Sequence, residues 1–424
     1  MLRISFTKEG FLITLYSIIV IFLPILNVYK FVLPVGDVLA ILGFFVLYNN
    51  RNWIGGNETR AQRTGYGIFV IYCILSIPLS IISGADINEI FSKNLHLVLY
   101  MIYGIYLSKY YFRYSEFFNL FLRVVSVLAC IELAQFIVYL ATGRQLLLLI
   151  PSIPLNYSIS NYRDYTDMFT RAALSQGYRP SSLFLEPAHY AFYALIALII
   201  VLMKKNKSKY EYIKILIYIL SIICSYSSGG VICMAICIIY YFVANGANHK
   251  STAEFIFKTS MIAASIFAAV YVLQHETRLI SMISERLMSI GSSTYDTSGN
   301  RRVLRGLFVW RELPFLNKIF GTGMGNLLST IVHENILVLT DRAFSDEMSS
   351  LFYLMCSCGI LGTCLYYWTI IRKFFFSNQI QKLVIITFLI SSFFNNNILQ
   401  GVSVIYLLMM FTKSHMAYEL YENE

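Results

Sequence analysis

The sequence predicts an all-α, polytopic membrane protein, and its composition, its hydropathy and the lengths of its apolar segments lead to that prediction. Of its 424 residues, 57% are hydrophobic and 13% are charged, whereas soluble domains contain about 25% charged residues. The mean hydropathy is +0.64. Apolar segments of about 20 residues recur along the chain, and that is the length that an α-helix needs to cross a bilayer.

Twelve membrane spans are expected, within a single membrane domain that covers residues 1–424. The seventh and eighth segments, and the last two, are short and closely joined, so ten or eleven spans are the alternatives. The expected spans lie at about 10–29, 32–49, 65–83, 90–108, 116–141, 187–203, 211–226, 229–244, 254–273, 350–371, 381–394 and 398–412.

Basic residues collect in alternate connections between these segments, and cytoplasmic loops are the ones enriched in Lys and Arg. Arg51 and Arg63, for example, follow the second segment, whereas the next connection, 83–89, is neutral or acidic. Both termini are therefore predicted to be cytoplasmic. Two long loops, residues 142–186 and 274–349, are predicted to be external.

The two external loops differ from the rest of the chain in their basic residues. They carry eleven arginines and one lysine, whereas the whole chain has eighteen arginines and fifteen lysines. The planar guanidinium group binds phosphate or carboxylate through two parallel hydrogen bonds, which an ammonium group does not. This bias predicts binding of an anionic group outside the membrane. The alternative is a solvated surface on which the arginines pair with acidic residues.

The stretch 177–193 joins the first external loop to the next span. Pro187 is expected to be the first residue of a helix, because its missing N–H would be unpaired there anyway. Glu186 then lies at the helix N-terminus, at the level of the membrane surface, and Arg179 can reach the same mouth. A cation and a carboxylate held there indicate chemistry on a charged, lipid-linked substrate. The alternative is that Glu186 only caps the helix and that Arg179 only anchors the loop.

The second external loop is expected to contain helices. An amphipathic helix lying in the membrane interface is predicted over 275–290, and a second helix over 300–310. Arg301 and Arg305 share one face of that second helix and Arg302 is adjacent. Its N-terminus is therefore a predicted anion site.

Three polar or Gly-rich segments follow. Gly321-Thr-Gly-Met-Gly325 is interpreted as a turn that brings the backbone close to a neighbour, because a nucleotide loop needs a preceding strand and a following Lys-Ser/Thr. Asp346 and Glu347 stand just before the next span, where they either mirror Glu186 or cap the helix. The turn 395–397, of three asparagines, is expected to help line a cavity.

Some ionisable residues lie inside predicted spans, and those that stand out are Asp37, Lys93, His96, Arg123 and Glu132. Such residues are functional candidates, but they are too sparse along the chain for a proton relay. None of the eight cysteines lies in an external loop, and none has the spacing of a metal site. We therefore expect neither a disulfide framework nor a metal.

In their order and spacing these motifs resemble the O-antigen polymerase (Wzy-type) family of bacterial polysaccharide assembly, within the O-antigen ligase-like superfamily. The similarity covers essentially the whole chain, with its dozen spans and two Arg-bearing external loops. The matching motifs are R-x-S-S-x-F-x-E-P (Arg179 to Pro187), the Arg-led helix, F-G-x-G-x-G-N (Phe320 to Asn326) and Gly359-x-x-Gly362.

The resemblance implies a membrane glycosyltransferase of GT-C-like architecture, embedded in the bacterial cytoplasmic (inner) membrane and working without a cofactor. Its implied substrates are oligosaccharide repeat units carried on undecaprenyl pyrophosphate, which it would join on the external face of the membrane. A chain-length regulator and a flippase are the implied partners, and nucleic acid is not.

The chemistry assigns roles to the candidate residues. A pyrophosphate leaving group needs cations that stabilise its developing charge, and the acceptor hydroxyl needs a base or a hydrogen-bond acceptor within reach. We expect Glu186, with Asp346 or Glu347 as alternatives, to act on the hydroxyl. The pyrophosphate is expected to bind Arg171, Arg179, Arg301, Arg302 and Arg305.

Other functions fit parts of the pattern. An O-antigen ligase, which transfers glycan from the lipid carrier to the lipid A–core, shares this layout. Ligases typically carry His-Asn just ahead of the span with Gly-x-x-Gly, where this chain has Asp346, Glu347 and Met348; His333 lies further back and takes the catalytic role if the loop folds differently. A lipid-linked oligosaccharide transporter or flippase should lack a long folded external loop, and it usually shows an internal repeat, which we do not find. A sensor without any site is disfavoured by the arginine bias.

Overall fold

The computed structural model of the chain describes residues 8–31, 33–51, 63–82, 86–150, 153–156, 178–204, 207–245, 304–334, 336 and 348–411. These residues are mostly helical and contain no β-strand. Three helical segments are long and apolar enough to cross a membrane: Lys8–Leu26, Ile87–Tyr111 and Tyr114–Thr142. This agrees with an all-α membrane protein, whereas twelve spans and a GT-C-like architecture stay predictions.

Helices occupy every predicted span that falls within the described residues. The span predicted at 254–273 and the amphipathic helix predicted at 275–290 lie outside them. The chain divides into two compact units: unit 1 comprises residues 1–124, 148–177 and 301–424, and unit 2 comprises residues 125–147 and 178–300. The single membrane domain expected for the chain stays a prediction, and each unit is described by itself.

Unit 1 begins with α1 (Lys8–Leu26), which packs against α2 (Val35–Asn50). The helix pair α3 (Arg63–Leu75) and α4 (Ile77–Ile82) comes next. One continuous helical run then follows, made of α5 (Ile87–Met101), the π-helix η2 (Ile102–Leu107) and α6 (Ser108–Tyr111). Gly104 of η2 allows a close approach to α22 (Val402–Phe411), because a Cβ at Gly104 would lie 3.0 Å from Cβ of Leu407.

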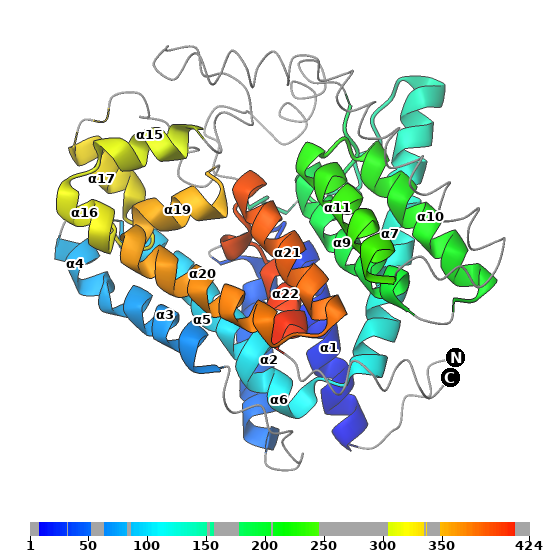
Figure 1. Cartoon of the computed structure of the whole chain (residues 1–424), viewed down its shortest axis with the longest axis horizontal. Helices are drawn as coiled ribbons and strands as arrows, with labels where there is room; N and C mark the ends of the chain where they lie inside the picture. The colour runs from blue at the N-terminus through cyan, green and yellow to red at the C-terminus, as the bar shows by residue number, and fades with distance from the viewer. Residues whose placement is uncertain are drawn as a thin grey trace. The chain divides into compact units, whose positions relative to one another are not determined.

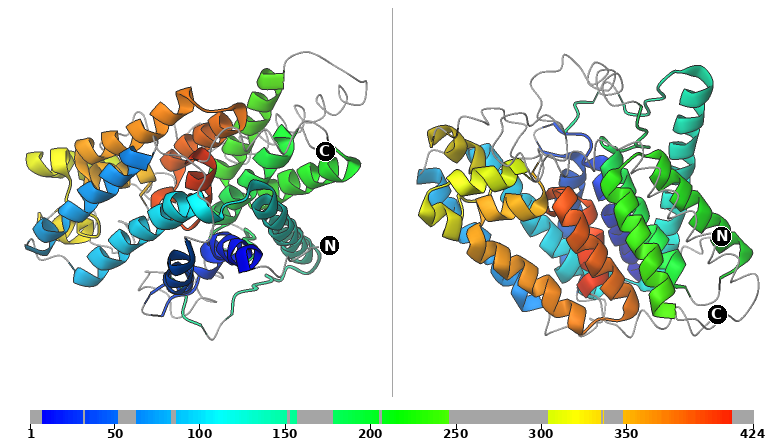
Figure 2. Two further views of the ribbon diagram at one scale, coloured as in Figure 1. Left: turned by 90° about the horizontal axis from the view of Figure 1, so that it is seen from below. Right: turned by 45° about the horizontal axis from the view of Figure 1, so that its top comes forward.

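The C-terminal part of unit 1 combines short and long helices. The short helices α15 (Leu304–Glu312), α16 (Phe315–Phe320) and α17 (Leu327–His333) lie together, in yellow in Figures 1 and 2. The helices α19 (Ser350–Ser357), α20 (Gly359–Phe375) and α21 (Gln379–Phe394) follow, and a 3-10 turn η4 (Asn397–Leu399) leads into α22. Helix α20 runs alongside α3, as both figures show. The helix predicted over 300–310 corresponds to α15, of which the residues from Leu304 onward are described.

Two predicted spans are interrupted, which corrects the sequence-based prediction. The span predicted at 350–371 is broken between α19 and α20, where Gly359 has a φ of +65°. The span predicted at 65–83 is broken at Ser76, between α3 and α4. The break at Gly359 has a contact as its reason: the backbone of Ile319 and Gly321 occupies the space where a side chain at Gly359 would lie.

The turn 321–325 confirms the prediction that it brings its backbone close to a neighbour. Its three glycines have φ values of +87°, +94° and +88°, which glycine adopts without the steric cost that other residues have. The N–H groups of Thr322 and Gly323 donate to the carbonyls of Cys356 (3.0 Å) and Ser357 (2.8 Å). A Cβ at Gly325 would lie 2.6 Å from the Cα of Ile90. The turn therefore connects the end of α19 with the start of α5.

Unit 2 contains the C-terminal part of α7 (Tyr114–Thr142), then α9 (Pro187–Met203), α10 (Lys209–Cys224) and α11 (Ser228–Asn245). Helix α9 is apolar all round, and both α10 and α11 pack against it; in Figure 1 these three helices lie side by side in green. A helix that is hydrophobic on every face is one that is buried, and nearly all of its side chains are. Because α9 is the centre of unit 2, its N-terminus is a fixed point on which a site can be built.

Candidate functional site

The N-terminus of α9 carries the acidic residue that the sequence singles out. Pro187 is its first residue and Glu186 occupies the N-cap position, both as predicted. The Glu186 side chain makes no capping hydrogen bond to the helix. Instead its Oε2 lies 3.8 Å from Nε2 of His189, and each of the two side chains is 29% exposed. The pair is open enough to meet a ligand.

Arg179 lies on the segment that leads into this helix. Its Nη2 donates to the carbonyl of Tyr226 at 2.9 Å, which connects the segment to the turn between α10 and α11. The side chain is half-buried. A guanidinium group has five N–H donors in a fixed planar arrangement, and the bond to Tyr226 fixes the direction of this one.

Two residues in this region have strained backbone conformations. Ser182 (φ +53°) and Tyr226 (φ +49°) are the non-glycine residues with positive φ in the described part of the chain. Left-handed backbone is uncommon for non-glycine residues, and bulky side chains such as Tyr rarely adopt it. Strained residues cluster at functional sites, where surrounding contacts hold them in place. Both strained residues adjoin Arg179: one lies in its own turn and the other supplies its hydrogen-bond acceptor.

The side chain of Gln135, on α7, forms hydrogen bonds with the strained turn at Ser182. The Ser182 N–H donates to Oε1 of Gln135 at 2.8 Å, and Nε2 of Gln135 donates to the Ser182 carbonyl at 3.2 Å. The same Nε2 donates to the Leu146 carbonyl at 2.9 Å. The Ser182 hydroxyl donates to the Leu128 carbonyl of α7 at 2.9 Å. Gln135 and Ser182 are both 2% exposed. The buried amide of Gln135 therefore provides hydrogen-bond partners for both the N–H and the carbonyl of Ser182.

Glu132 lies one helical turn before Gln135 on α7. It is fully buried, and neither of its carboxylate oxygens has a hydrogen-bond partner among the described residues. Burial, with a smaller contribution from the Glu132 charge, raises the pKa of Tyr178 to about 12. Tyr178 is therefore protonated at neutral pH, and its hydroxyl faces the Leu146 carbonyl at 3.5 Å.

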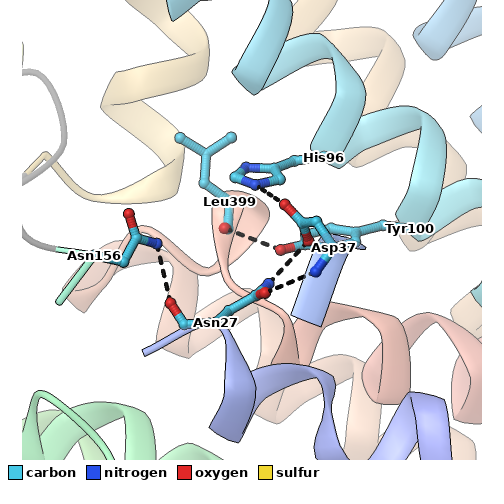
Figure 3. A network of polar contacts seen from close by, with 6 residues as sticks. All are labelled: Asn27, Asp37, His96, Tyr100, Asn156 and Leu399. Carbon is cyan, nitrogen blue, oxygen red and sulfur yellow. Dashed lines mark hydrogen bonds and ion pairs between the residues drawn. The ribbon is translucent and has the colours of Figure 1, made fainter. Parts of the chain in front are cut away.

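Unit 1 contains a second polar centre, shown in Figure 3. Asp37 at the start of α2 is fully buried, and its Oδ2 is in direct contact with Nε2 of His96 on α5. The His96 ring stacks on Tyr100, with centroids 5.8 Å apart and ring planes 5° apart. The Tyr100 hydroxyl donates to the Leu399 carbonyl at 3.2 Å. An acid–histidine pair therefore lies at the meeting point of α2, α5 and η4.

Asn27 holds Asp37 through a reciprocal pair of hydrogen bonds. Its Nδ2 donates to Oδ1 of Asp37 at 3.0 Å, and the Asp37 N–H donates to Oδ1 of Asn27 at 3.1 Å. Gly36 makes this approach possible, since a Cβ there would collide with the Asn27 amide. The Asn27 carbonyl accepts from Nδ2 of Asn156 at 3.0 Å. A short piece of the first predicted external loop is thereby bonded to the segment that carries the pair.

The asparagine turn 395–397 lies in the same unit and is buried. Both amide atoms of Asn396, Oδ1 of Asn397 and Oε1 of Gln400 have no hydrogen-bond partner within the described residues. Most buried polar groups in proteins do have a partner, from the protein or from water. The segment 396–400 is therefore polar and unsatisfied, while the cavity predicted for it stays a prediction.

The other predicted site residues fall in three groups. His333, at the end of α17, is 81% exposed and lies 3.4 Å from its neighbour Glu334. Arg305 lies on α15, but its side chain is not among those described. Arg171, Arg301, Arg302, Asp346 and Glu347 lie outside the described residues. Arg179 and Glu186 both lie on the segment that leads into α9, and their joint role in one site stays a prediction.

Sequence reasoning did not find three contributors to these sites. The Glu186–His189 pair was visible as an i,i+3 spacing, which places two side chains on one helix face. Gln135 and Asn27 gave no comparable signal, because each acts through contacts with residues far away in the chain. Among the described residues, no three His, Cys, Asp or Glu side chains gather as metal ligands would. The sequence matches no protein-family model and no curated protein.

Proposed function

We propose that this chain is a polysaccharide (O-antigen) polymerase, a membrane glycosyltransferase of the bacterial cytoplasmic membrane. It joins oligosaccharide repeat units that are carried on undecaprenyl pyrophosphate, at the external face. A hydroxyl of the acceptor unit attacks the anomeric carbon of the donor glycan. The bond from that carbon to the pyrophosphate breaks, the lipid pyrophosphate leaves, and the hydroxyl proton passes to a base.

One observation carries the proposal: Arg179 and Glu186 belong to a single built segment. The strained Ser182 lies between them in the chain, and it is clamped by Gln135. The segment combines a guanidinium that is directed by Tyr226 with a partly exposed carboxylate that does not cap its helix. A cation and a hydrogen-bond acceptor are the two groups that glycosyl transfer from a pyrophosphate requires.

Within the proposal, Arg179 binds the pyrophosphate and stabilises its charge as it leaves. Arg171, Arg301, Arg302 and Arg305 are the further cations proposed for it. Glu186 accepts a hydrogen bond from a sugar hydroxyl, and Asp346, Glu347 and His333 stay the alternatives for that role. A chain-length regulator and a flippase are the proposed partners, and both termini are proposed to be cytoplasmic.

The test uses a strain that lacks the gene, with its lipid-attached polysaccharide separated by size on a gel. A polymerase predicts one repeat unit per anchor in the deletion strain and a full ladder after complementation with the wild-type gene. Arg179→Ala and Glu186→Ala should fail to restore the ladder, although the protein accumulates in the membrane.

Other outcomes identify other functions. Long chains that stay on undecaprenyl pyrophosphate would indicate a ligase, whose final acceptor is the lipid A–core. Repeat units that accumulate on the cytoplasmic side would indicate a flippase. An unchanged ladder in the deletion strain would rule out the polymerase.

A further inference from the structure

The proposed reaction releases a proton from the acceptor hydroxyl, and a positioned histidine is the side chain that most often takes such a proton. His189 lies three residues after Glu186, in the first turn of α9. Its Nε2 is 3.8 Å from Oε2 of Glu186, and each side chain is 29% exposed. The imidazole therefore lies in unit 2, beside a proposed site residue, and is open to a ligand.

The backbone that carries these two side chains is held by buried neighbours. Tyr190, the residue after His189, is fully buried. The N–H groups of His189 and Tyr190 donate to the Glu186 carbonyl at 3.0 and 3.4 Å. On the other side of Glu186, the ring of Phe184 packs on Tyr190 and Tyr193, with centroids 6.2 and 5.3 Å apart. The backbone positions of Glu186 and His189 are therefore fixed, although both side chains are partly exposed.

The two side chains suit different parts of a proton transfer. Imidazole is the side chain whose ordinary charge change falls between about pH 5 and 8, and a general base works best when its pKa lies near the operating pH. Carboxylates ordinarily titrate near about pH 4, so they are weaker bases. The separation of 3.8 Å between Nε2 and Oε2 exceeds a hydrogen bond, but at that distance a carboxylate still stabilises an imidazolium by its charge.

We propose that His189 is the general base for the acceptor hydroxyl and that Glu186 stabilises the imidazolium that forms. This inference rests on the proposed function. The O–H bond of the acceptor breaks, and its proton moves to a ring nitrogen of His189. The acceptor oxygen forms the new glycosidic bond with the anomeric carbon, and the electron pair of the broken carbon–oxygen bond leaves with the lipid pyrophosphate. The imidazolium returns its proton to water after the product has left.

The experiment measures glycan elongation by the purified full chain in lipid nanodiscs, with the lipid-linked repeat unit as substrate. His189→Gln and His189→Ala should each lower kcat by about 100-fold, the lower end of the usual contribution of a general base. KM should change by less than about threefold, because the base acts on a proton that is released in the transition state and not on substrate binding.

Two small molecules distinguish a base from a side chain that only fills space. Imidazole should raise the rate of His189→Ala by at least about tenfold, because the exposed position admits a free base that accepts the proton. Pyrazole has the same ring size but is a much weaker base, so it should not raise the rate. Tyr218→Phe is the matched control variant, because it removes the hydrogen bond of 2.8 Å between Tyr218 and Ser126 in the same unit. It should keep at least about half of the wild-type rate and should not respond to imidazole.

Glu186→Gln tests the charge of the carboxylate while it preserves the shape of the side chain. We expect kcat to fall at least about fivefold, because two unit charges about 4 Å apart interact by that factor even in water. In a chain that already carries His189→Ala, no imidazolium forms. Adding Glu186→Gln to that chain should therefore lower the rate by less than about twofold, and this difference measures the coupling of the two side chains.

The outcomes separate the two levels of the account. If the wild-type chain elongates no glycan, the proposed function fails and this inference fails with it. If the wild-type chain is active and His189→Gln elongates at the wild-type rate, the inference is overturned while the function stands. Equal acceleration of His189→Ala by imidazole and pyrazole, or none by either, also overturns it, because His189 then acts only through structure. If the His189 variants do not accumulate in the membrane, a wild-type rate of Glu186→Gln overturns the inference.

Discussion

The two units present an acidic residue and a histidine in opposite ways. In unit 2 Glu186 and His189 are 3.8 Å apart and each is 29% exposed, next to backbone turns that are themselves strained. In unit 1 Asp37 and His96 are in direct contact and buried, and the backbone around them is regular. A partly exposed pair keeps much of its hydration, so it costs little and can be rearranged by a ligand. A buried pair has lost its water and must be held by partners.

The two units also differ in the contacts that hold these charged residues in place. In unit 2 the side-chain amide of Gln135, on α7, holds the segment that carries Arg179 and Glu186 through hydrogen bonds with Ser182. Unit 1 supports its pair through two reciprocal hydrogen bonds between Asn27 and Asp37, a tyrosine stacked on His96, and Gly36, which lets Asn27 come close. We therefore expect changes in unit 2 to affect activity more than stability, and changes in unit 1 to affect both.

The largest expected effect on activity comes from Arg179→Ala. Loss of one group that stabilises a developing charge lowers rates by about 100- to 1,000-fold. Since Arg179 is only half-buried and its bond to Tyr226 reaches a backbone carbonyl, the thermal midpoint should change little. Glycan elongation and thermal unfolding of the same preparation measure both. Arg179→Lys keeps the positive charge but lacks the planar guanidinium group. Its elongation rate should therefore lie between those of the wild type and Arg179→Ala. An inactive protein with a greatly lowered midpoint would contradict the distinction between the units.

The largest expected effect on stability comes from Gly359→Ala in unit 1. The residue has positive φ, and a side chain there would meet the backbone of Ile319 and Gly321. Strain and overpacking together should cost about 2–5 kcal/mol. Gly67→Ala is the matched control, because nothing lies within 4 Å of a Cβ on that glycine of α3. The control should gain about 0.5–1 kcal/mol from its better helix propensity. Thermal unfolding in detergent compares the two, and equal midpoints would contradict the packing described for the break.

A smaller effect is expected from Gln135→Leu, which removes the clamp. The Ser182 N–H and carbonyl would lose their partner, at a cost of about 1–3 kcal/mol, and activity should fall because Arg179 and Glu186 lose their fixed spacing. Adding Ser182→Gly should restore part of the activity, because glycine adopts positive φ without strain. Adding Ser182→Ala should not. Elongation rates of the two double variants decide, and equal rates would show that the clamp does not act through the left-handed turn.

The smallest effect is expected from Glu132→Gln. The carboxylate is buried without a hydrogen-bond partner among the described residues, so replacing it with a neutral amide of the same shape should leave stability unchanged or raise it by about 1 kcal/mol. Elongation should stay within about threefold of the wild type, because an amide of the same shape can keep the contact that Glu132 makes with the backbone of Ser182, in the turn that follows Arg179. A loss of activity as large as that of Arg179→Ala would place Glu132 in the chemistry.

The helices and the start of α9 followed from local sequence. Long apolar runs predicted the helical segments, and the properties of proline placed Pro187 and Glu186 correctly. The break at Gly359 was not predicted, because it depends on the turn 321–325, which packs against it from elsewhere in the chain. The same reason applies to the candidate sites. Asp37 and His96 were recognised as unusual residues, but their pairing depends on how α2 and α5 pack, and no local pattern reports that.

The measurement that tests the central claim most directly is glycan elongation by the purified wild-type chain. The chain in lipid nanodiscs is given only its lipid-linked repeat unit, and the products are separated by size together with those of Arg179→Ala. The account predicts a ladder of lipid-linked chains from the wild type, free undecaprenyl pyrophosphate in proportion to the bonds formed, and almost no products from the variant. Absence of any ladder, or transfer that requires added lipid A–core, would contradict it.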